Sequence, residues 1–483
     1  MTEHILFLTG KLAEKSLNRV LQDMQPDFTY EVRNVGVSVA ALMTVRMLGR
    51  RLDNIDAVDK IIVPGLCQGD LSGLEDQFAT RVQRGPKDLK DLPAFFGRAG
   101  VVPDLSRYAV CIFAEIVDAP NISVAEILTQ AQRYRNDGAD MIDLGCLPGL
   151  EFPHLEESVR MLQAEGFKVS VDSLETDELV RGGQAGADFL LSLKQGSLWV
   201  ADEVDSTPVI IPEQPGDMTS LYAALEILAG KGRECIADSI LDPIHFGFTE
   251  SLLRYHALRQ QCPDIPIMMG IGNLTELTEA DTSGINAILF GIISELGIAN
   301  VLATEVSPHA CAAVREADQA RRIMYAAHDA DSLPKGYSSA LLTTHARKPF
   351  PYSAAEIADL AAAVRDPSYR VRISREGIHV FNRDGLVCAQ DPFKLFPQLP
   401  LLAEDAPHAF YMGVELARAQ IAWQLGKRYE QDEALDWGVA VAPENHADTG
   451  SAAHALKPET GDYKEAGSTL QASRKRKKKA AKS

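Results

Sequence analysis

The sequence lacks paired cysteines. Seven cysteines occur singly along the 483 residues, and no two of them form a CxxC pair. This spacing excludes a zinc ribbon and gives no sign of a disulfide framework, so we expect reduced thiols that mostly pack in cores. The cysteines are Cys67, Cys111, Cys146, Cys235, Cys262, Cys311 and Cys388.

Long apolar runs and an excess of basic residues are also missing. No run approaches the ~20 apolar residues that a membrane-spanning helix needs, and the start MTEHILFLTG lacks the basic and apolar regions of a signal peptide. Acidic residues outnumber basic ones by 67 to 48, which gives a net charge of −19. We therefore expect a cytoplasmic protein whose partners are neither membranes nor nucleic acids.

The apolar content of the sequence, 46%, is enough for two or three domains that each have a hydrophobic core. Residues 1–104 indicate a small N-terminal α/β domain, because the runs 5–10 and 60–65 are apolar and end in glycine. Residues 442–483 are polar and basic, and we expect this tail to be disordered.

A second flanking domain is predicted for residues 333–441. Residues 369–391 are typical of two or three antiparallel strands, with RDG as a hairpin turn. Residues 408–432 have apolar positions every three or four residues, which predicts a long amphipathic helix. The segment is therefore expected to be an α+β domain.

The central residues 105–332 alternate between apolar runs and helical patterns. This alternation predicts a (β/α)₈ barrel, in which each parallel strand is followed by a helix. Helices are expected at 124–138 and 251–261, for example. The eight predicted strands are 109–116, 140–145, 167–172, 187–193, 208–212, 235–242, 265–270 and 299–306.

Three of these runs are closed by an aspartate: Asp143, Asp172 and Asp242. In a (β/α)₈ barrel, the residue that leaves a strand lies at the mouth where ligands bind. Several carboxylates at one mouth favour a ligand that is cationic or rich in N–H donors. A protonated pterin or an aminopyrimidinone edge would meet this requirement.

Three segments around these aspartates resemble the pterin-binding family typified by dihydropteroate synthase, which also includes pterin-dependent methyltransferases. They are GADMIDLGCLPG (138–149), VSVDSLETDELVRGGQAGADFLLSL (169–193) and ILDPIHFGF (240–248), in family order and spacing. The resemblance implies a barrel of the pterin-binding type and a reduced pterin as substrate or ligand. It also implies that Asp143 and Asp242 hold the pterin ring, with Asp172 beside them.

The sequence departs from the synthases where they bind pyrophosphate. The first strand continues as AEIVDAPNIS (114–123) instead of an NxTPDSF loop, and GIGNLTEL (270–277) stands in place of SRKSF. The arginine and histidine of the eighth strand are replaced within ATEVSPHA (303–310). The lysine after the seventh strand and the arginine of the eighth strand, which would neutralise a departing pyrophosphate, are both missing. We therefore expect little synthesis of dihydropteroate itself. Lys194 and His309 are the nearest candidates to replace them.

The combined pattern is similar to dihydropteroate-synthase-like proteins associated with tetrahydromethanopterin biosynthesis. That resemblance implies a transferase that joins a 6-hydroxymethyl-dihydropterin derivative to a ribofuranosylaminobenzene phosphate. A pterin-dependent methyltransferase and a non-catalytic pterin-binding or scaffold subunit remain open alternatives. We also expect a homodimer or other oligomer.

Further residues complete the predicted site. Catalytic roles are predicted for Asp172 and for Glu115 and Asp118 at the end of the first strand, where solvated loop carboxylates are the alternative. His245 is predicted to contact the ligand from the ILDPIHFGF loop. Ser192 is predicted to contact the pterin, because the fourth-strand asparagine of the synthases falls on Leu191 or Ser192.

Two polar residues after the seventh strand, Asn273 and Glu276, are predicted to contact the pterin, with capping of the next helix as the alternative. Cys146 follows Asp143 at the predicted mouth, but no adjacent histidine would activate it as a nucleophile. No metal ligands are predicted; Mg²⁺ is left open as a cofactor, without support from the sequence.

Overall fold

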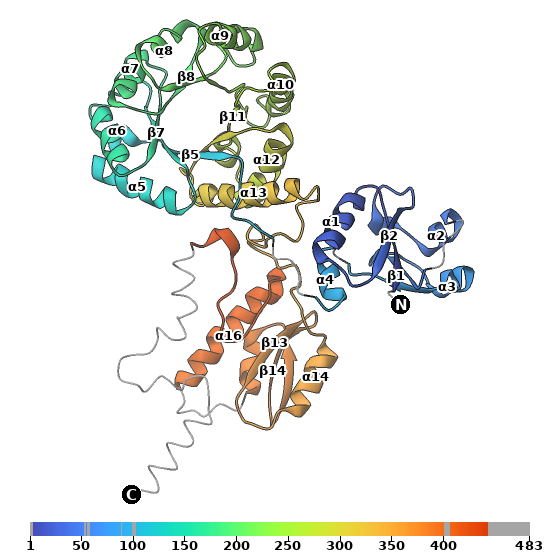
Figure 1. The fold of residues 1–483 in the computed structure, drawn as a ribbon. Coiled ribbons are helices and arrows are strands. Elements are labelled where there is room, and N and C mark those ends of the chain that lie inside the picture. The colour runs from blue at the N-terminus through green and yellow to red at the C-terminus, as the bar shows by residue number, and fades with distance from the viewer. Residues whose placement is uncertain are drawn as a thin grey trace, which may run out of the picture. The chain divides into compact units, whose positions relative to one another are not determined.

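A computed structural model describes residues 3–442 apart from 53–54, 56–57, 88, 99–102 and 400–405. The described chain is built on three sheets, of four, eight and three strands (Figure 1). Within the described residues, no helix combines the length and the apolarity needed to cross a membrane. The tail predicted for residues 442–483 lies outside the described residues except for its first residue.

The first sheet is parallel, with strand order β2-β1-β3-β4. Alternate residues of β1 point to opposite faces: Ile5 and Phe7 pack with α1 and α4, whereas Leu6 and Leu8 pack with α2 and α3. This is the two-residue period of a strand that is buried on both sides. The elements are β1 (His4–Thr9), α1 (Glu14–Met24), β2 (Thr29–Asn34), α2 (Val45–Arg51), β3 (Lys60–Val63), α3 (Ser72–Phe78), β4 (Arg81–Arg84) and α4 (Leu92–Phe95).

The second sheet is the predicted barrel. Its parallel strands follow the order β10-β9-β8-β7-β6-β5-β12-β11, and a bridge between Ala237 and Ile267 joins the two ends. The fold class predicted from the sequence is therefore confirmed. The strands are β5 (Cys111–Ile116), β6 (Met141–Gly145), β7 (Lys168–Asp172), β8 (Phe189–Leu193), β9 (Thr207–Ile210), β10 (Ile236–Ala237), β11 (Met268–Gly270) and β12 (Asn300–Thr304).

Helices surround the barrel strands on the outside (Figure 1). The helix predicted at 124–138 is α5, which begins after a capping box formed by Ser123 and Glu126. The helices are α5 (Val124–Asn136), α6 (Leu155–Ala164), α7 (Thr176–Ala185), α8 (Val200–Glu203), α9 (Met218–Gly230), α10 (Phe248–Gln261), α11 (Gly272–Thr275), α12 (Thr282–Leu296) and α13 (Ala313–Asp329).

Bulky side chains fill the amino-end half of the barrel interior. Phe113, Met141 and Ile236 belong to one buried cluster, together with residues of β8, β9 and β11. Because side chains on a strand repeat every two residues, the next inward positions are two residues further along each strand. In β5 and β6 those positions are acidic: Glu115 and Asp143 lie next to the apolar cluster, on the side of the carboxyl ends of the strands.

Strand β10 ends earlier than predicted. The sequence predicts a strand over 235–242, but the strand covers only Ile236–Ala237. The Asp238 side chain accepts a hydrogen bond from the backbone N–H of Ile240 at 2.7 Å, and Ile240 has a φ of +66°. This turn ends the backbone pairing of β10 with its neighbouring strands. The first residue after the strand is therefore Asp238 and not Asp242.

The third sheet is antiparallel, in the order β13-β14-β15. Its hairpin turn is the predicted RDG, since Asn382 pairs with Gly385. Helix α16 packs through Met412 and Leu416 on one face, and α14 packs on Phe381. Helix α16 ends at Leu425, before the predicted 432, because Gly426 has a φ of +64°. The elements are α14 (Ala354–Ala363), β13 (Arg370–Ser374), β14 (Gly377–Asn382), β15 (Gly385–Ala389), α15 (Pro392–Leu395) and α16 (Ala406–Leu425).

Candidate functional site

Three acidic side chains meet at the carboxyl ends of neighbouring barrel strands. Glu115 of β5 pairs in register with Asp143 of β6, and Asp172 ends β7. One carboxylate oxygen from each residue lies within 4.8 Å of the other two. Gly145 makes room for this group, because a Cβ at its position would lie 2.7 Å from Oε1 of Glu115. We call Glu115, Asp143 and Asp172 the carboxylate cluster.

Asp143 is the buried member of the carboxylate cluster, with no exposed surface. Its Oδ1 accepts a hydrogen bond from the hydroxyl of Ser170, while Oδ2 has no hydrogen-bond partner among the described residues. Burial, followed by the negative charges of Asp172 and Glu115, raises the pKa of Asp143 well above its ordinary value. The raised pKa favours the neutral carboxyl group, and Oδ2 is a buried polar atom with which a ligand would form a hydrogen bond.

Asp172 is anchored on one side only. Oδ1 accepts a hydrogen bond from the Ser192 hydroxyl at 2.7 Å. Ser192 reaches it from a distorted part of β8, where Ser192 has a φ of +75° and the register with β9 shifts. Burial raises the pKa of the Asp172 carboxyl. The predicted residue Ser192 is therefore brought into the site, where it orients Asp172.

Asp238 is a site candidate that the sequence reasoning missed. It follows β10 directly, and its Oδ1 accepts hydrogen bonds from the Tyr255 hydroxyl at 2.6 Å and from Ile240 N–H at 2.7 Å. Burial, with a contribution from the charge of Asp172, raises the pKa of Asp238 to about 6. One signal could have identified it: Asp238 lies two residues after the core residue Ile236, as Asp143 does after Met141.

Asp242, which is predicted to hold the pterin, forms an ion pair with Arg254. Its Oδ2 accepts a hydrogen bond from Arg254 of α10 at 2.6 Å, and the two side chains are 17% and 14% exposed. Arg254 also donates to the carbonyl of Ile240 at 3.0 Å. These contacts fasten the loop after β10 to α10. A role for Asp242 in ligand binding stays a prediction.

The polar residues after β11 hydrogen-bond to loop backbone. The Asn273 side chain donates to the carbonyl of Leu241 at 2.7 Å. Glu276 accepts hydrogen bonds from the N–H groups of Val306 and Ser307, both at 2.8 Å. These contacts describe structural roles for Asn273 and Glu276, while their predicted contact with a ligand stays untested.

The side chains of the other predicted residues form no hydrogen bond with the carboxylate cluster in the described structure. Asp118 and His245 are exposed, and His245 has a φ of +69° in its loop. The exposed His309 makes a ring hydrogen bond with the carbonyl of Thr275 at 3.1 Å. Burial and the charge of Glu178 raise the pKa of Cys146, which argues against a nucleophilic thiolate.

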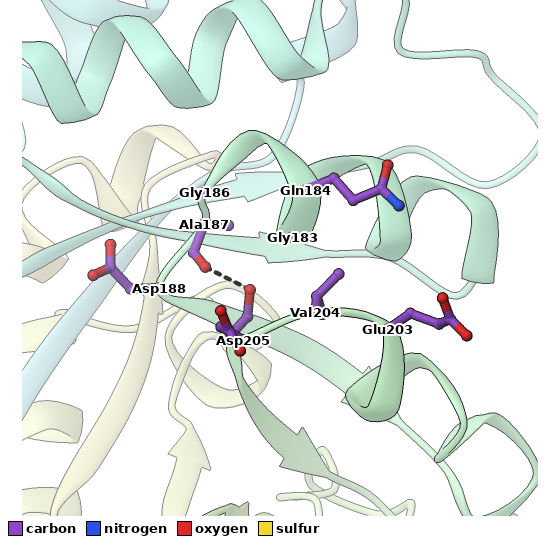
Figure 2. A pocket seen from close by; sticks show the side chains of 9 residues that line it. Gly183, Gln184, Gly186, Ala187, Asp188, Glu203, Val204 and Asp205 are labelled. Carbon is purple, nitrogen blue, oxygen red and sulfur yellow. Dashed lines mark hydrogen bonds between the residues drawn. The ribbon is translucent and has the colours of Figure 1, made fainter.

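Two hollows lie at opposite ends of the barrel strands. The smaller, about 190 Å³, is lined by Ser192, Lys194 and Thr176 among others, and so adjoins the residue that orients Asp172. The larger, about 540 Å³, lies where β8 and β9 begin and is lined by Asp188 and Asp205 (Figure 2). Barrel enzymes bind ligands at the carboxyl ends of their strands, so we place the candidate site at the end with the smaller hollow.

Comparisons by sequence give two matches. A family of unknown function, DUF6513, matches residues 3–87, which cover the four-stranded parallel sheet. An uncharacterized protein of Methanocaldococcus jannaschii is 26% identical over an alignment of 524 positions, which covers 89% of this chain and 98% of that protein.

Comparisons by structure give dihydropteroate synthases, each similar to about half of this chain. The enzyme of Yersinia pestis with a pterin–sulfa conjugate is 19% identical, covers 47% of this chain and 95% of its own, and has a TM-score of 0.37. The enzyme of Coxiella burnetii in complex with pteroic acid is 14% identical, covers 46% and 93%, and has a TM-score of 0.38.

Proposed function

We propose that the barrel binds a reduced pterin at the carboxyl ends of β7 and β10. The observation that carries this proposal is the pair Asp172 and Asp238: in each, Oδ1 is fixed by a hydroxyl donor, and no described residue hydrogen-bonds to Oδ2. A pterin offers several N–H donors along one edge, which carboxylate oxygens accept. The motifs at 138–149 and 169–193 support the same ligand.

We further propose a transferase reaction in tetrahydromethanopterin biosynthesis. An arylamine nitrogen of a ribofuranosylaminobenzene phosphate would attack the methylene carbon attached to the pterin. The C–N bond forms, the bond from that carbon to its leaving oxygen breaks, and the amine loses a proton. The resemblance of GIGNLTEL and ATEVSPHA to proteins of that pathway supports this reaction.

Lys194 would serve the anionic end of either substrate. It lines the small hollow together with Ser192 and with Glu213, whose Oε1 accepts a hydrogen bond from the N–H of Gly196 at 2.7 Å. A lysine there offers one positive charge to a phosphate, in place of the two cations that the synthases use. This supports binding of a phosphate group more than rapid expulsion of pyrophosphate.

A pterin-dependent methyltransferase is the second candidate. It needs a pterin site but no pyrophosphate site, and the missing cations after β11 and β12 are what favours it. A pterin-binding subunit without catalysis would bind the same ligand and turn over nothing. The three functions therefore differ in product and not in the ligand bound.

The test is a binding titration followed by product analysis. Purified full-length protein is titrated with 6-hydroxymethyl-7,8-dihydropterin, and then incubated with its pyrophosphate ester and either p-aminobenzoate or ribofuranosylaminobenzene phosphate. We expect pterin binding and a product from the ribosylated amine, with little dihydropteroate. Efficient dihydropteroate formation would contradict the proposed reaction, and absence of pterin binding would contradict the proposed function altogether.

A further inference from the structure

The N-terminal parallel sheet has a topological switch point between its neighbouring strands β1 and β3. The connection that leaves β1 leads to α1 on one face of the sheet, whereas the connection that leaves β3 leads to α3 on the other face (Figure 1). In open parallel sheets, ligands bind outside the carboxyl ends of the strands at the position where the connections diverge in this way. The residues that follow β1 and β3 are therefore candidates for a second binding site.

Gly10, the buried residue that follows β1, has a backbone N–H group that donates to no acceptor among the described residues. The preceding residue, Thr9, accepts a hydrogen bond from the N–H of Val35 at 3.1 Å, on the side of β2. Alternate residues of a central parallel strand bond to opposite neighbours, so the N–H of Gly10 is directed to the side of β3. Native proteins rarely leave a buried N–H unpaired, and a ligand at the switch point would supply the acceptor.

Large apolar side chains are exposed in the three connections at this end of the sheet. The connections are hydrogen-bonded to one another: the N–H of Leu12 donates to the carbonyl of Ser38, and the N–H of Gln68 donates to the carbonyl of Met43, both at 3.1 Å. Exposed apolar residues that gather in this way mark binding sites, whereas isolated ones do not. The residues and their exposed fractions are Leu12 (68%), Val39 (39%), Leu42 (69%) and Leu66 (43%).

The charged groups at the switch point favour an anion. Lys11, the residue after Gly10, is exposed. Two acids of this end already accept hydrogen bonds within the domain: Glu14 from the side chain of Asn34 at 2.8 Å, and Asp70 from the hydroxyl of Ser72 at 2.6 Å. A lysine amine beside an unpaired backbone N–H is a donor set that suits phosphate oxygens.

We propose that the carboxyl end of the N-terminal sheet binds a mononucleotide, with its phosphate at Gly10 and Lys11 and its base against Leu12 and Leu66. A flat base has apolar faces that would cover the exposed leucines, while the phosphate would accept from the two donors. The segment TGKLAE (9–14) lacks the glycines of GxGxxG, which argues against a dinucleotide. This inference uses residues of the first sheet only and does not depend on the proposed pterin function.

The experiment is a fluorescence titration of the full chain with the N-methylanthraniloyl (mant) derivatives of ATP and GTP. The wild type is compared with Lys11→Gln and Leu66→Ser, and with Arg81→Gln as a matched control, because Arg81 is an exposed cation at the amino end of the same sheet. We expect a Kd below about 1 mM for at least one probe. Affinity should be at least about tenfold weaker in Lys11→Gln, about fivefold weaker in Leu66→Ser, and unchanged within about twofold in Arg81→Gln.

Three results would overturn the inference: no binding of either probe to the wild type, unchanged affinity in both Lys11→Gln and Leu66→Ser, or an equal loss in Arg81→Gln. Competition separates the parts of the ligand, since inorganic phosphate that displaces the probe as well as ATP does would show that the base is not bound, against the proposal. We expect 6-hydroxymethyl-7,8-dihydropterin to leave the probe in place, and its displacement by the pterin would show that the probe occupies the barrel. Thermal melting checks that each variant, changed at an exposed side chain, is folded.

Discussion

The two ends of the barrel use aspartates in different ways. At the amino end, Asp140 and Asp188 precede β6 and β8, and their carboxylates accept hydrogen bonds from the N–H groups of Ile112 at 2.8 Å and Val169 at 2.9 Å. Asp140 also binds Arg321, whose side chain is 1% exposed. These carboxylates join neighbouring strands.

At the carboxyl end, the acids are left partly unsatisfied. Asp143, Asp172 and Asp238 each hold one oxygen on a hydroxyl donor, and no described residue hydrogen-bonds to the other. The same residue type therefore stabilises the fold at one end and is available to a ligand at the other. This matches the division of labour in (β/α)₈ barrels, where the amino end carries stability and the carboxyl end carries function.

The largest effect is expected at the amino end, from Asp140→Ala. The change would leave the guanidinium of Arg321 buried without its carboxylate, and breaking a buried pair in this way costs about 3–5 kcal/mol. The free energy of unfolding, measured by urea denaturation, should fall by that amount. Asp205→Ala, at an exposed position of the same end, is the control; equal stability of the two variants would show that Asp140 does not stabilise the amino end.

A smaller effect, with a defined pH dependence, is expected for Asp238→Asn. The folded pKa of about 6 exceeds the ordinary value of 3.8. At a pH between these two values, the folded state therefore keeps a proton on Asp238 that the unfolded state has lost. Wild-type stability should therefore decrease as pH rises from about 4 to 6, by on the order of 2 kcal/mol. Asparagine does not titrate and can still accept from Tyr255, so that decrease should vanish in the variant. Parallel pH profiles for both proteins would refute the assignment.

The smallest effect is expected for Asp143→Asn. The substitution removes a buried carboxyl group that is disfavoured as an anion beside Glu115 and Asp172, and adds an amide N–H₂ group next to their carboxylate oxygens. We expect the free energy of unfolding to rise by about 1 kcal/mol, in contrast to the loss in Asp140→Ala. Thermal and urea unfolding measure this, and a destabilisation would show that Asp143 supports the fold.

The strands and their acids could be largely predicted from the sequence. Apolar runs that end in glycine or aspartate mark β6 and β7, and both contain the aspartates expected there, Asp143 and Asp172. The hairpin at RDG and the parallel first sheet were predictable for the same reason: local patterns of two-residue period and turn residues determine them.

The end of β10 could not be predicted in this way. ILDPIHFGF looks like a strand that closes on Asp242, but a side-chain turn at Asp238 stops the strand earlier, and Arg254, 12 residues further on, pairs with Asp242. Which of two nearby aspartates faces the barrel interior depends on these tertiary contacts. The hydrogen bonds that Glu276 accepts from the loop after β12 are likewise long-range, since Ser307 lies 31 positions after Glu276 in the sequence.

The most direct test of the central claim compares one aspartate from each end of the barrel. Fluorescence titration with 6-hydroxymethyl-7,8-dihydropterin is carried out on the wild type, on Asp238→Asn and on Asp205→Asn. An asparagine at 238 would direct an N–H₂ group at the N–H donors of the pterin, so binding should weaken by about 2 kcal/mol, roughly 30-fold, while Asp205→Asn should bind like the wild type. Equal affinity in all three proteins, or a loss confined to Asp205→Asn, would contradict a pterin site at the carboxyl end.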